Sequence, residues 1–194
     1  MSDDAANDSP APATPVTILP PGTRLQEFEI TGLVGEGGFG IVYAANDTQL
    51  NRRVAIKEYM PSQLAARTGR RTVKLRSTEF GDTFAAGLKS FINEARMLAQ
   101  FKHAALVEVF RFWEENGTAY MAMPLYEGPT LKDYLKGHPE MSNERWLRGL
   151  LSPLLDPREH MHGMPGYHRD ITPDNPRLLK NGAPLLLDLA QNDP

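Results

Sequence analysis

The sequence contains no cysteine, no long apolar run and no surplus of positive charge. Its 194 residues carry 21 lysines and arginines against 24 aspartates and glutamates, so the formal net charge is −3. The missing cysteines exclude disulfide bonds, thiolate metal ligands and cysteine nucleophiles, and they fit a reducing cytoplasm. The acidic balance argues against a nucleic-acid partner. Because no apolar run approaches the ~18 residues of a membrane span, we expect no membrane segment in this chain.

Proline is concentrated at the N-terminus, where it is mixed with alanine, serine, aspartate and asparagine. The first 22 residues contain Pro10, Pro12, Pro15, Pro20 and Pro21. Such a composition buries too little apolar surface to offset the entropy lost on ordering. We therefore predict a disordered leader over residues 1–22. The rest of the chain is long enough for one ordinary domain of about 100 to 150 residues, or slightly more.

Short runs rich in β-branched and aromatic residues follow the leader and predict strands. The five predicted strands are Phe28–Val34, Ile41–Ala45, Arg52–Tyr59, Val107–Trp113 and Thr118–Met123. Asn116-Gly117 precedes the last of them and predicts a hairpin turn, because both residue types tolerate a positive φ.

Helical periodicity is confined to three stretches and separates the strands into two groups. Apolar residues from Phe91 to Phe101 recur at helical spacing between the third and fourth strands. Thr130–Lys136 and Asn143–His162 also look helical, and Leu185–Leu187 looks like a short buried strand. This order predicts an α+β fold, with a small lobe of antiparallel strands and one helix followed by a mainly helical part.

A basic cluster lies in the stretch from residue 58 to residue 90, to which the sequence assigns no function. Its members are Arg67, Arg70, Arg71, Lys74 and Arg76. We interpret the cluster as a solvated loop face rather than as a binding patch.

A glycine-rich motif lies between the first two predicted strands. Gly35-Glu36-Gly37-Gly38-Phe39-Gly40-Ile41-Val42 fits the pattern G-x-G-x-x-G-x-V. Glycines let the backbone approach phosphate groups closely. In dinucleotide-binding proteins the same motif opens a helix, whereas here a predicted strand follows it. The alternative to a phosphate-binding loop is a glycine-rich hairpin that binds no ligand.

Two charged residues extend this pattern. Val54-Ala55-Ile56-Lys57 places a lysine on the third predicted strand, and Glu94 lies on the predicted helix. A surface lysine and a solvated glutamate are the ordinary alternative. The order of the motifs favours a functional pair. The chain has first a glycine-rich loop, then a strand with a lysine, a helix with a glutamate and a hairpin. After them comes the segment Tyr167-His168-Arg169-Asp170-Ile171-Thr172-Pro173-Asp174-Asn175.

From Arg24 to about Asp188 this succession resembles a bacterial member of the eukaryotic-like serine/threonine protein kinases. The resemblance implies a protein-kinase-like α+β fold, with a five-stranded antiparallel N-lobe, one helix in that lobe, and a partial, mainly helical C-lobe. The N-lobe and hinge would then cover residues 23–127. The incomplete C-lobe with its catalytic loop would cover residues 128–194.

The resemblance also implies the residue roles. Lys57 is expected to bond the phosphates of ATP while Glu94 holds it, and Asp170 is expected to deprotonate the acceptor hydroxyl. Asn175 and Asp188 are the implied Mg²⁺ ligands. The implied nucleotide-binding residues are Gly35, Gly37, Gly38, Gly40, Val42, Ala55, Lys57, Met123, Pro124 and Tyr126. The implied cofactors are ATP and Mg²⁺, and the implied partner is a protein substrate with a serine or threonine hydroxyl.

Met121–Gly128 is similar to the hinge between the lobes of a kinase, where backbone groups read the adenine. Pro124 lacks an N–H but keeps the carbonyl that this position needs, and Tyr126 keeps both backbone groups. Met123 is the residue expected to guard the back of the pocket.

Several positions depart from the family pattern. Thr172 replaces a lysine that serves the transferring phosphate, and Asp188-Leu189-Ala190 replaces Asp-Phe-Gly. Pro157 interrupts a predicted helix, and Pro176-Arg177 stands where an apolar strand normally follows the asparagine.

The sequence given ends 24 residues after Asp170 (194 minus 170), before any activation segment. We therefore expect a protein kinase truncated after its magnesium-binding aspartate. The alternative is an inactive pseudokinase or fragment that binds only nucleotide or a protein partner. A transition-metal site at His160, His162 and His168 is a third hypothesis.

Overall fold

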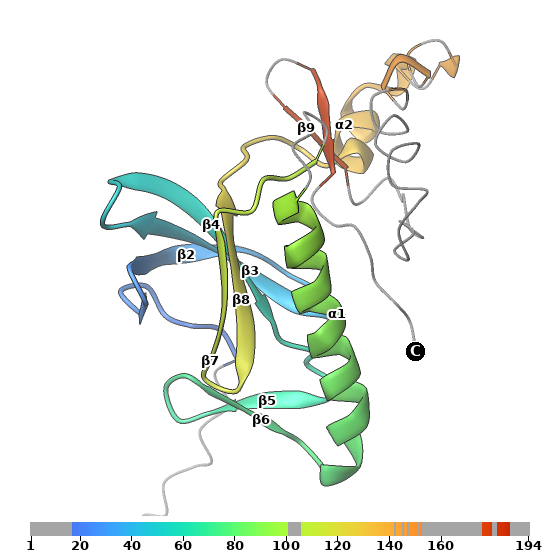
Figure 1. Ribbon diagram of the computed structural model, residues 1–194. Coiled ribbons are helices and arrows are strands. Elements are labelled where there is room, and N and C mark those ends of the chain that lie inside the picture. Colours follow the sequence, from blue (N-terminus) through green and yellow to red (C-terminus); the bar gives the residue numbers. More distant parts are fainter. Residues whose placement is uncertain are drawn as a thin grey trace, which may run out of the picture.

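The computed structural model describes residues 17–100, 106–141, 143, 144, 146, 148–150, 152, 176–179 and 182–186. A six-stranded antiparallel sheet and one long helix dominate this part of the chain (Figure 1). In spatial order the strands are β1 (Arg24–Leu25), β2 (Phe28–Glu36), β3 (Gly40–Asp47), β4 (Arg52–Tyr59), β8 (Thr118–Pro124) and β7 (Arg111–Glu115). The prediction of five strands therefore missed the two-residue β1, which pairs with the start of β2.

Successive residues of β4 and β8 enter two different cores, one on each face of the sheet. Ala55, Tyr59 and Met121 belong to the core on the helix side, and Ile56 and Tyr120 belong to the core on the far side. This alternation is the period of two that strand geometry imposes. Because both faces are buried, β8 is almost continuously apolar, and Val54–Ile56 of β4 are three consecutive apolar residues instead of an alternating pattern.

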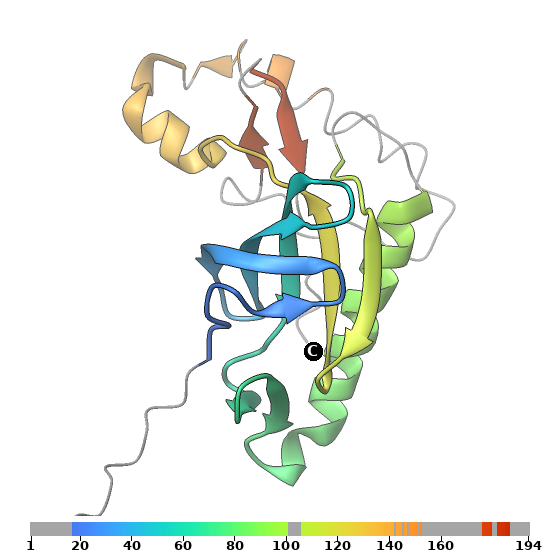
Figure 2. The same cartoon turned by 90° about the vertical axis from the view of Figure 1, so that its left-hand side faces the viewer.

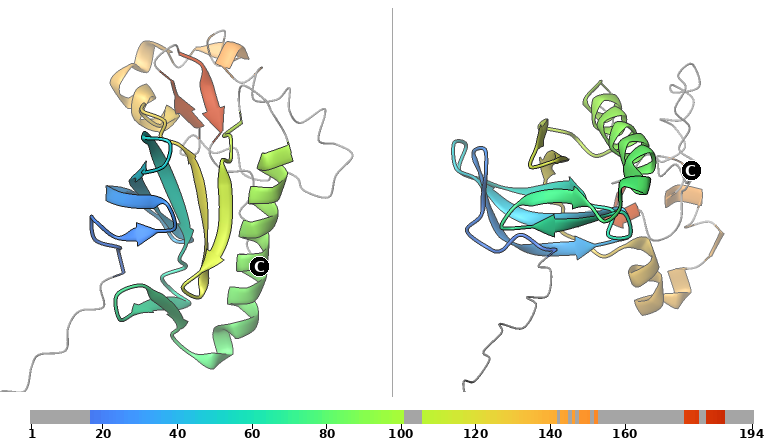
Figure 3. Two further views of the ribbon diagram at one scale, coloured as in Figure 1. Left: turned by 60° about the vertical axis from the view of Figure 1, so that its left-hand side comes forward. Right: turned by 90° about the horizontal axis from the view of Figure 1, so that it is seen from below.

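The helix α1 (Gly81–Gln100) covers one face of the sheet and runs beside β8 (Figures 1 and 3). Its buried residues are Phe91, Ile92, Glu94, Ala95 and Leu98. The apolar spacing that predicted this helix locates only its second half. The first ten residues contain Gly81 and Gly87 and few large apolar side chains, so periodicity gives no signal there.

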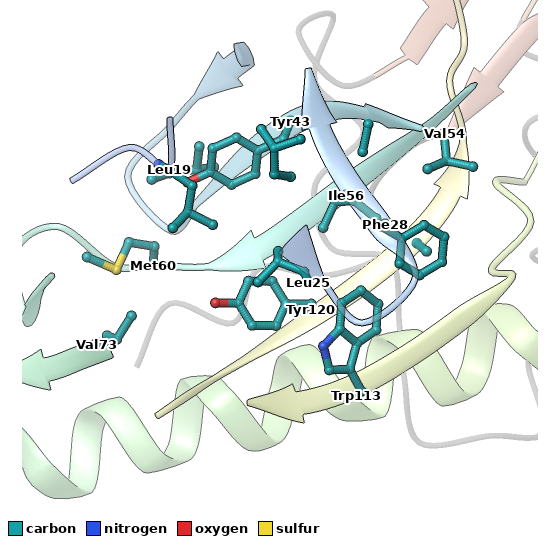
Figure 4. Packing of buried hydrophobic residues seen from close by; sticks show 14 of the residues in the cluster. Leu19, Leu25, Phe28, Tyr43, Val54, Ile56, Met60, Val73, Trp113 and Tyr120 are labelled. Carbon is teal, nitrogen blue, oxygen red and sulfur yellow. The ribbon is translucent and has the colours of Figure 1, made fainter. Parts of the chain in front are cut away.

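The far face of the sheet is closed by the curl of the strands and by the segment before β1 (Figures 2 and 4). Leu19 is 1% exposed and packs in this core, and its N–H donates to the hydroxyl of Tyr43 at 3.2 Å. The N–H of Gly22 donates to the carbonyl of Ile30 at 2.8 Å. The predicted disordered leader is therefore wrong over residues 17–22, because one leucine there has a buried site to fill.

The stretch from residue 58 to residue 90 contains a second small sheet, which the sequence did not predict. It is a hairpin of β5 (Ala65–Thr68) and β6 (Thr72–Leu75), followed by the short 3-10 turn η1 (Thr78–Phe80). The hairpin meets the β7–β8 turn, where the N–H of Val73 donates to the carbonyl of Asn116 at 2.7 Å. Asn116 and Gly117 have φ values of 57° and 78°, as the hairpin prediction required.

One member of the basic cluster contradicts its interpretation as a solvated face. Arg67 is 4% exposed, and its Nη2 lies 2.6 Å from Oε2 of the fully buried Glu58. The guanidinium also donates to the carbonyls of Thr17 at 2.9 Å and Arg71 at 2.6 Å. Arg67 shares a face of β5 with the buried Ala65, so strand alternation directs it to the core. The other four basic residues are exposed.

Glu58 is the centre of this buried network. Its Oε2 also accepts a hydrogen bond from the Tyr43 hydroxyl at 2.9 Å, while its Oε1 has no hydrogen-bond partner within the described residues. Burial, reinforced by the charge of Glu58, raises the pKa of Tyr43 and of Tyr120. Both hydroxyls therefore keep their protons at neutral pH and can act as donors.

The second part of the described chain holds the helix α2 (Leu131–Gly137) and a two-stranded sheet of β9 (Pro176–Leu178) and β10 (Pro184–Leu186). Leu131, Leu150 and Leu178 form its core. The helix predicted at Thr130–Lys136 is confirmed, with Thr130 as the N-cap. The described residues from Glu144 to Ser152 are helical, whereas Pro157 lies outside the described residues.

One departure from the family pattern does not prevent a strand, and one strand prediction needs correction. A strand does form at Pro176-Arg177, because Pro176 is the first residue of β9, where its missing N–H is tolerated. The segment predicted as Val107–Trp113 becomes a strand only at Arg111. Val107 is fully buried outside regular structure, so its apolar character reflects burial instead of strand geometry. The predicted lobe boundary between residues 127 and 128 stays a prediction.

The helices within the described ranges include none that is both long enough and apolar enough to cross a membrane.

The buried pair of Glu58 and Arg67 gives a test of the far core. We expect Arg67→Met to lower the free energy of unfolding by about 3–5 kcal/mol, because it leaves a buried carboxylate without its cation. The control Arg70→Met removes an exposed arginine from the same hairpin and should change stability by less than about 0.5 kcal/mol. Urea unfolding followed by tryptophan fluorescence, to which the buried Trp113 contributes, measures both. Equal stability of the two variants would contradict the assignment.

Candidate active site

Two charged side chains from different elements meet between the sheet and α1. Lys57 lies on β4, and its Nζ is 3.7 Å from Oε1 of Glu94 on α1. The side chains are 15% and 4% exposed, so both charges are largely removed from water. The ammonium also lies 5.7 Å from the ring centroid of Phe91. A buried charge needs a partner, and here residues 37 positions apart in the sequence (94 minus 57) supply one another.

The glycine-rich segment forms the turn between β2 and β3, and its glycines differ in what surrounds them. A Cβ at Gly40 would lie 2.5 Å from the carbonyl oxygen of Glu58, so the packing of β3 against β4 requires this glycine. A Cβ at Gly35, Gly37 or Gly38 would meet no atom within 4 Å. The N–H of Gly37 donates to the carbonyl of Gly40 at 2.9 Å and closes the turn. The turn therefore leaves open space along its backbone.

A cavity of about 450 Å³ lies between this turn, the end of β4 and the first half of α1. Lys57 and Glu94 are both in its wall. The other predicted site residues that line it are Gly35, Gly37, Gly40 and Val42. Gly38, Ala55, Met123, Pro124 and Tyr126 are not in its lining.

Several of the predicted nucleotide-binding residues lie on the same face of the sheet as Lys57. Ala55 and Met123 are paired across β4 and β8, and both are buried in the core that faces α1. Val42 and Tyr126 pack against this core. Burial raises the pKa of the Tyr126 hydroxyl. Pro124 ends β8 opposite Val54.

The predicted catalytic base Asp170 and the predicted metal ligands Asn175 and Asp188 lie outside the described residues. The same holds for Thr172 and for His160, His162 and His168. Within the described ranges, no group of three or more histidine, aspartate and glutamate side chains could hold a metal ion.

Tyr59 was not among the predicted site residues, yet it lines the cavity together with Gly87, Ser90 and Phe91 of α1. A signal for it was present. Tyr59 follows Lys57 by two positions on one strand, so the two side chains share a face. Burial raises the pKa of the Tyr59 hydroxyl, which therefore keeps its proton at neutral pH.

The sequence matches the model of the protein kinase domain over residues 28–189, and the chain therefore belongs to the protein kinase family. Within this family it is similar to bacterial eukaryotic-like serine/threonine kinases. It is 29% identical to the serine/threonine-protein kinase PknD of Chlamydia trachomatis serovar L2b (strain UCH-1/proctitis), covering 84% of this chain and 17% of that protein.

Solved structures support the same fold. The apo form of PpkA-294 has a TM-score of 0.82 and 51% identity, covering 89% of this chain and 62% of the other. The kinase domain of Mycobacterium tuberculosis PknI has a TM-score of 0.68 at 18% identity, covers 89% of this chain and 62% of that chain, and supports the fold alone. The predicted family and the protein-kinase-like fold are confirmed. The chain spans less than two thirds of the length of these proteins.

The unequal surroundings of the glycines predict unequal effects of alanine. We expect Gly40→Ala to lower the free energy of unfolding by about 1–3 kcal/mol, because the added methyl group is forced against the carbonyl of Glu58. Gly37→Ala adds its methyl group in open space and should stay within about 0.5 kcal/mol of the unmodified chain. Urea unfolding measures both, and a larger loss for Gly37→Ala would refute this division.

Proposed function

We propose that this chain forms the ATP-binding and catalytic part of a protein kinase that transfers the γ-phosphate of ATP to a serine or threonine hydroxyl of a protein. The observation that carries the proposal is the buried ion pair of Lys57 and Glu94 in the wall of a cavity below a glycine-rich turn. Stabilisation of phosphate charge is most of what such an enzyme supplies. A fixed ammonium and an accessible backbone are suited to that task.

The described residues fit the triphosphate. Gly35, Gly37 and Gly38 leave room for phosphate oxygens to approach the backbone, which side chains at these positions would obstruct. Lys57 binds the α- and β-phosphates in this proposal, and Glu94 orients its ammonium. When bound, Mg²⁺ neutralises phosphate charge, and we assign it to Asn175 and Asp188.

The adenine end of the site is assigned to Val42, Ala55, Met123, Pro124 and Tyr126. The apolar side chains of the first three suit a flat aromatic base. The carbonyl of Pro124 and the backbone groups of Tyr126 are proposed to bind its polar edge. Met123 limits the depth of the pocket.

Asp170 is proposed to accept the proton of the acceptor hydroxyl as the γ-phosphate is transferred. We place this reaction in the cytoplasm, in keeping with the absence of cysteine. The acceptor is a protein, and the net charge of −3 gives no electrostatic support for a nucleic-acid partner.

A second candidate function is nucleotide binding without transfer. Two sequence features favour it. Thr172 takes the position of a phosphate-binding lysine, and Asp188-Leu189-Ala190 replaces Asp-Phe-Gly. The first change removes a cation from the transferring phosphate. Neither change affects the residues proposed to bind the adenine.

Three variants separate the two candidates. With labelled ATP, Mg²⁺ and a generic protein acceptor, we expect Asp170→Asn to reduce transfer by at least about 100-fold while the ATP-dependent rise in melting temperature persists. Lys57→Met should reduce both transfer and the rise in melting temperature. The control Lys89→Met removes an exposed lysine from α1 and should change neither.

Equal transfer by the unmodified chain, Lys57→Met and Asp170→Asn would reject the kinase proposal. A rise in melting temperature that depends on Lys57, without transfer by any of these proteins, would favour nucleotide binding alone. If ATP changes the melting temperature of none of them, both candidate functions fail.

A further inference from the structure

Tyr59 makes three contacts with α1, although it is the last residue of β4. Its hydroxyl donates to the carbonyl of Phe84 at 3.2 Å. Its ring centroid lies 5.1 Å from that of Phe84 and 5.9 Å from that of Phe91. These contacts tie the first half of α1 to the strand that carries Lys57.

Gly87 lies where Tyr59 reaches the helix. A Cβ at Gly87 would stand 2.2 Å from the hydroxyl oxygen of Tyr59 and 3.0 Å from its Cζ. Glycine in a helix interior costs about 1 kcal/mol relative to alanine. The backbone of α1 is helical at this point, so a special conformation does not account for the glycine. The space that the Tyr59 side chain occupies accounts for the glycine at position 87.

The contact of Tyr59 with Gly87 and the ion pair of Lys57 with Glu94 form two attachments between the same strand and the same helix. Tyr59 and Lys57 are two residues apart on one face of β4. Gly87 and Glu94 are seven residues apart, which is two helical turns or about 10 Å. Phe91 lies between them and contacts both Tyr59 and Lys57. Two contacts at separate points of α1 fix both its position along β4 and its angle to the sheet, whereas a single contact would leave the angle free to change.

We propose that Tyr59, seated against Gly87, is a positioning residue that sets the place of α1 and thereby holds Glu94 within reach of Lys57. Its importance for phosphate transfer rests on the proposed kinase function. The positioning itself is a property of the apo protein. It is therefore measured without ATP.

The rate at which Lys57 reacts with an amine-reactive acylating reagent reports on the ion pair. An ammonium that is 15% exposed and paired reacts slowly, and it reacts faster once Glu94 withdraws. We expect Gly87→Ala to raise the labelling rate of Lys57 by at least roughly fivefold, because the added methyl group overlaps the tyrosine hydroxyl and displaces α1. Mass spectrometry of the apo protein gives the rate, with the exposed Lys89 as internal reference.

Rescue separates positioning from general damage to the core. Tyr59→Phe removes the oxygen that lies 2.2 Å from the new methyl group and leaves the ring carbon Cζ at 3.0 Å, so Tyr59→Phe/Gly87→Ala should label Lys57 more slowly than Gly87→Ala does. The control Gly137→Ala adds a methyl group at the end of α2, where no atom lies within 4 Å, and should leave the rate unchanged. If Gly87→Ala does not fold, Tyr59→Leu must produce the same rise by removing the contact.

An unchanged labelling rate in Gly87→Ala, or a raised rate that Tyr59→Phe does not lower, overturns the proposal. Measurement of phosphate transfer on the same variants separates the two hypotheses. Labelling that follows the expected pattern in a chain without transfer leaves the positioning role intact and rejects the kinase function. If phosphate transfer occurs but the labelling rate of Lys57 is the same in all variants, only the positioning role of Tyr59 is rejected.

Discussion

The burial of β4 on both faces is the constraint on which the rest of the structure depends. Lys57 and Glu58 are adjacent in the sequence, so strand geometry points their side chains to opposite sides of the sheet. Each therefore places a charge in a poorly solvated environment. Glu94 of α1 forms an ion pair with Lys57, and Arg67 of the β5–β6 hairpin forms an ion pair with Glu58. The elements that cover the two faces of the sheet are thus attached by two ion pairs that originate at neighbouring positions.

The two ion pairs differ in a way that suits different tasks. Glu58 and Arg67 are 2.6 Å apart and almost fully buried, and Arg67 also binds the carbonyl of Thr17, which fastens the segment before β1. The Glu58–Arg67 pair therefore holds the β5–β6 hairpin and the segment before β1 firmly against this face of the sheet. Lys57 and Glu94 are 3.7 Å apart, and Lys57 is partly exposed to the cavity. Its ammonium therefore lies where a ligand in that cavity can reach it.

Much of the sheet and of the pair at the candidate site could be predicted from the sequence, because strong local signals agreed there. Asn116-Gly117 fixed a hairpin, and Val54–Lys57 combined a strand signal with a family motif. The first half of α1 and the β5–β6 hairpin could not be predicted. Their residues are mostly small or polar and gain their structure from contacts with residues far away in the sequence, such as that of Gly117 with Val73. The burial of Arg67 could not be predicted for the same reason, because it depends on an ion pair with Glu58, and the sequence does not show that these two residues lie together.

The glycines of the candidate site illustrate why a motif does not reveal the reason for each of its residues. Gly40 is required because a side chain would strike the carbonyl of Glu58, so it serves the packing of β3 against β4. Gly37 and Gly38 have no such neighbour. Since glycine lowers stability where nothing compensates for its flexibility, these two positions carry a cost that the fold alone does not explain. A ligand that needs close access to the backbone would explain it, and phosphate groups have that need. Gly37 lines the same cavity as Lys57 and Glu94, which favours a phosphate-bearing ligand there.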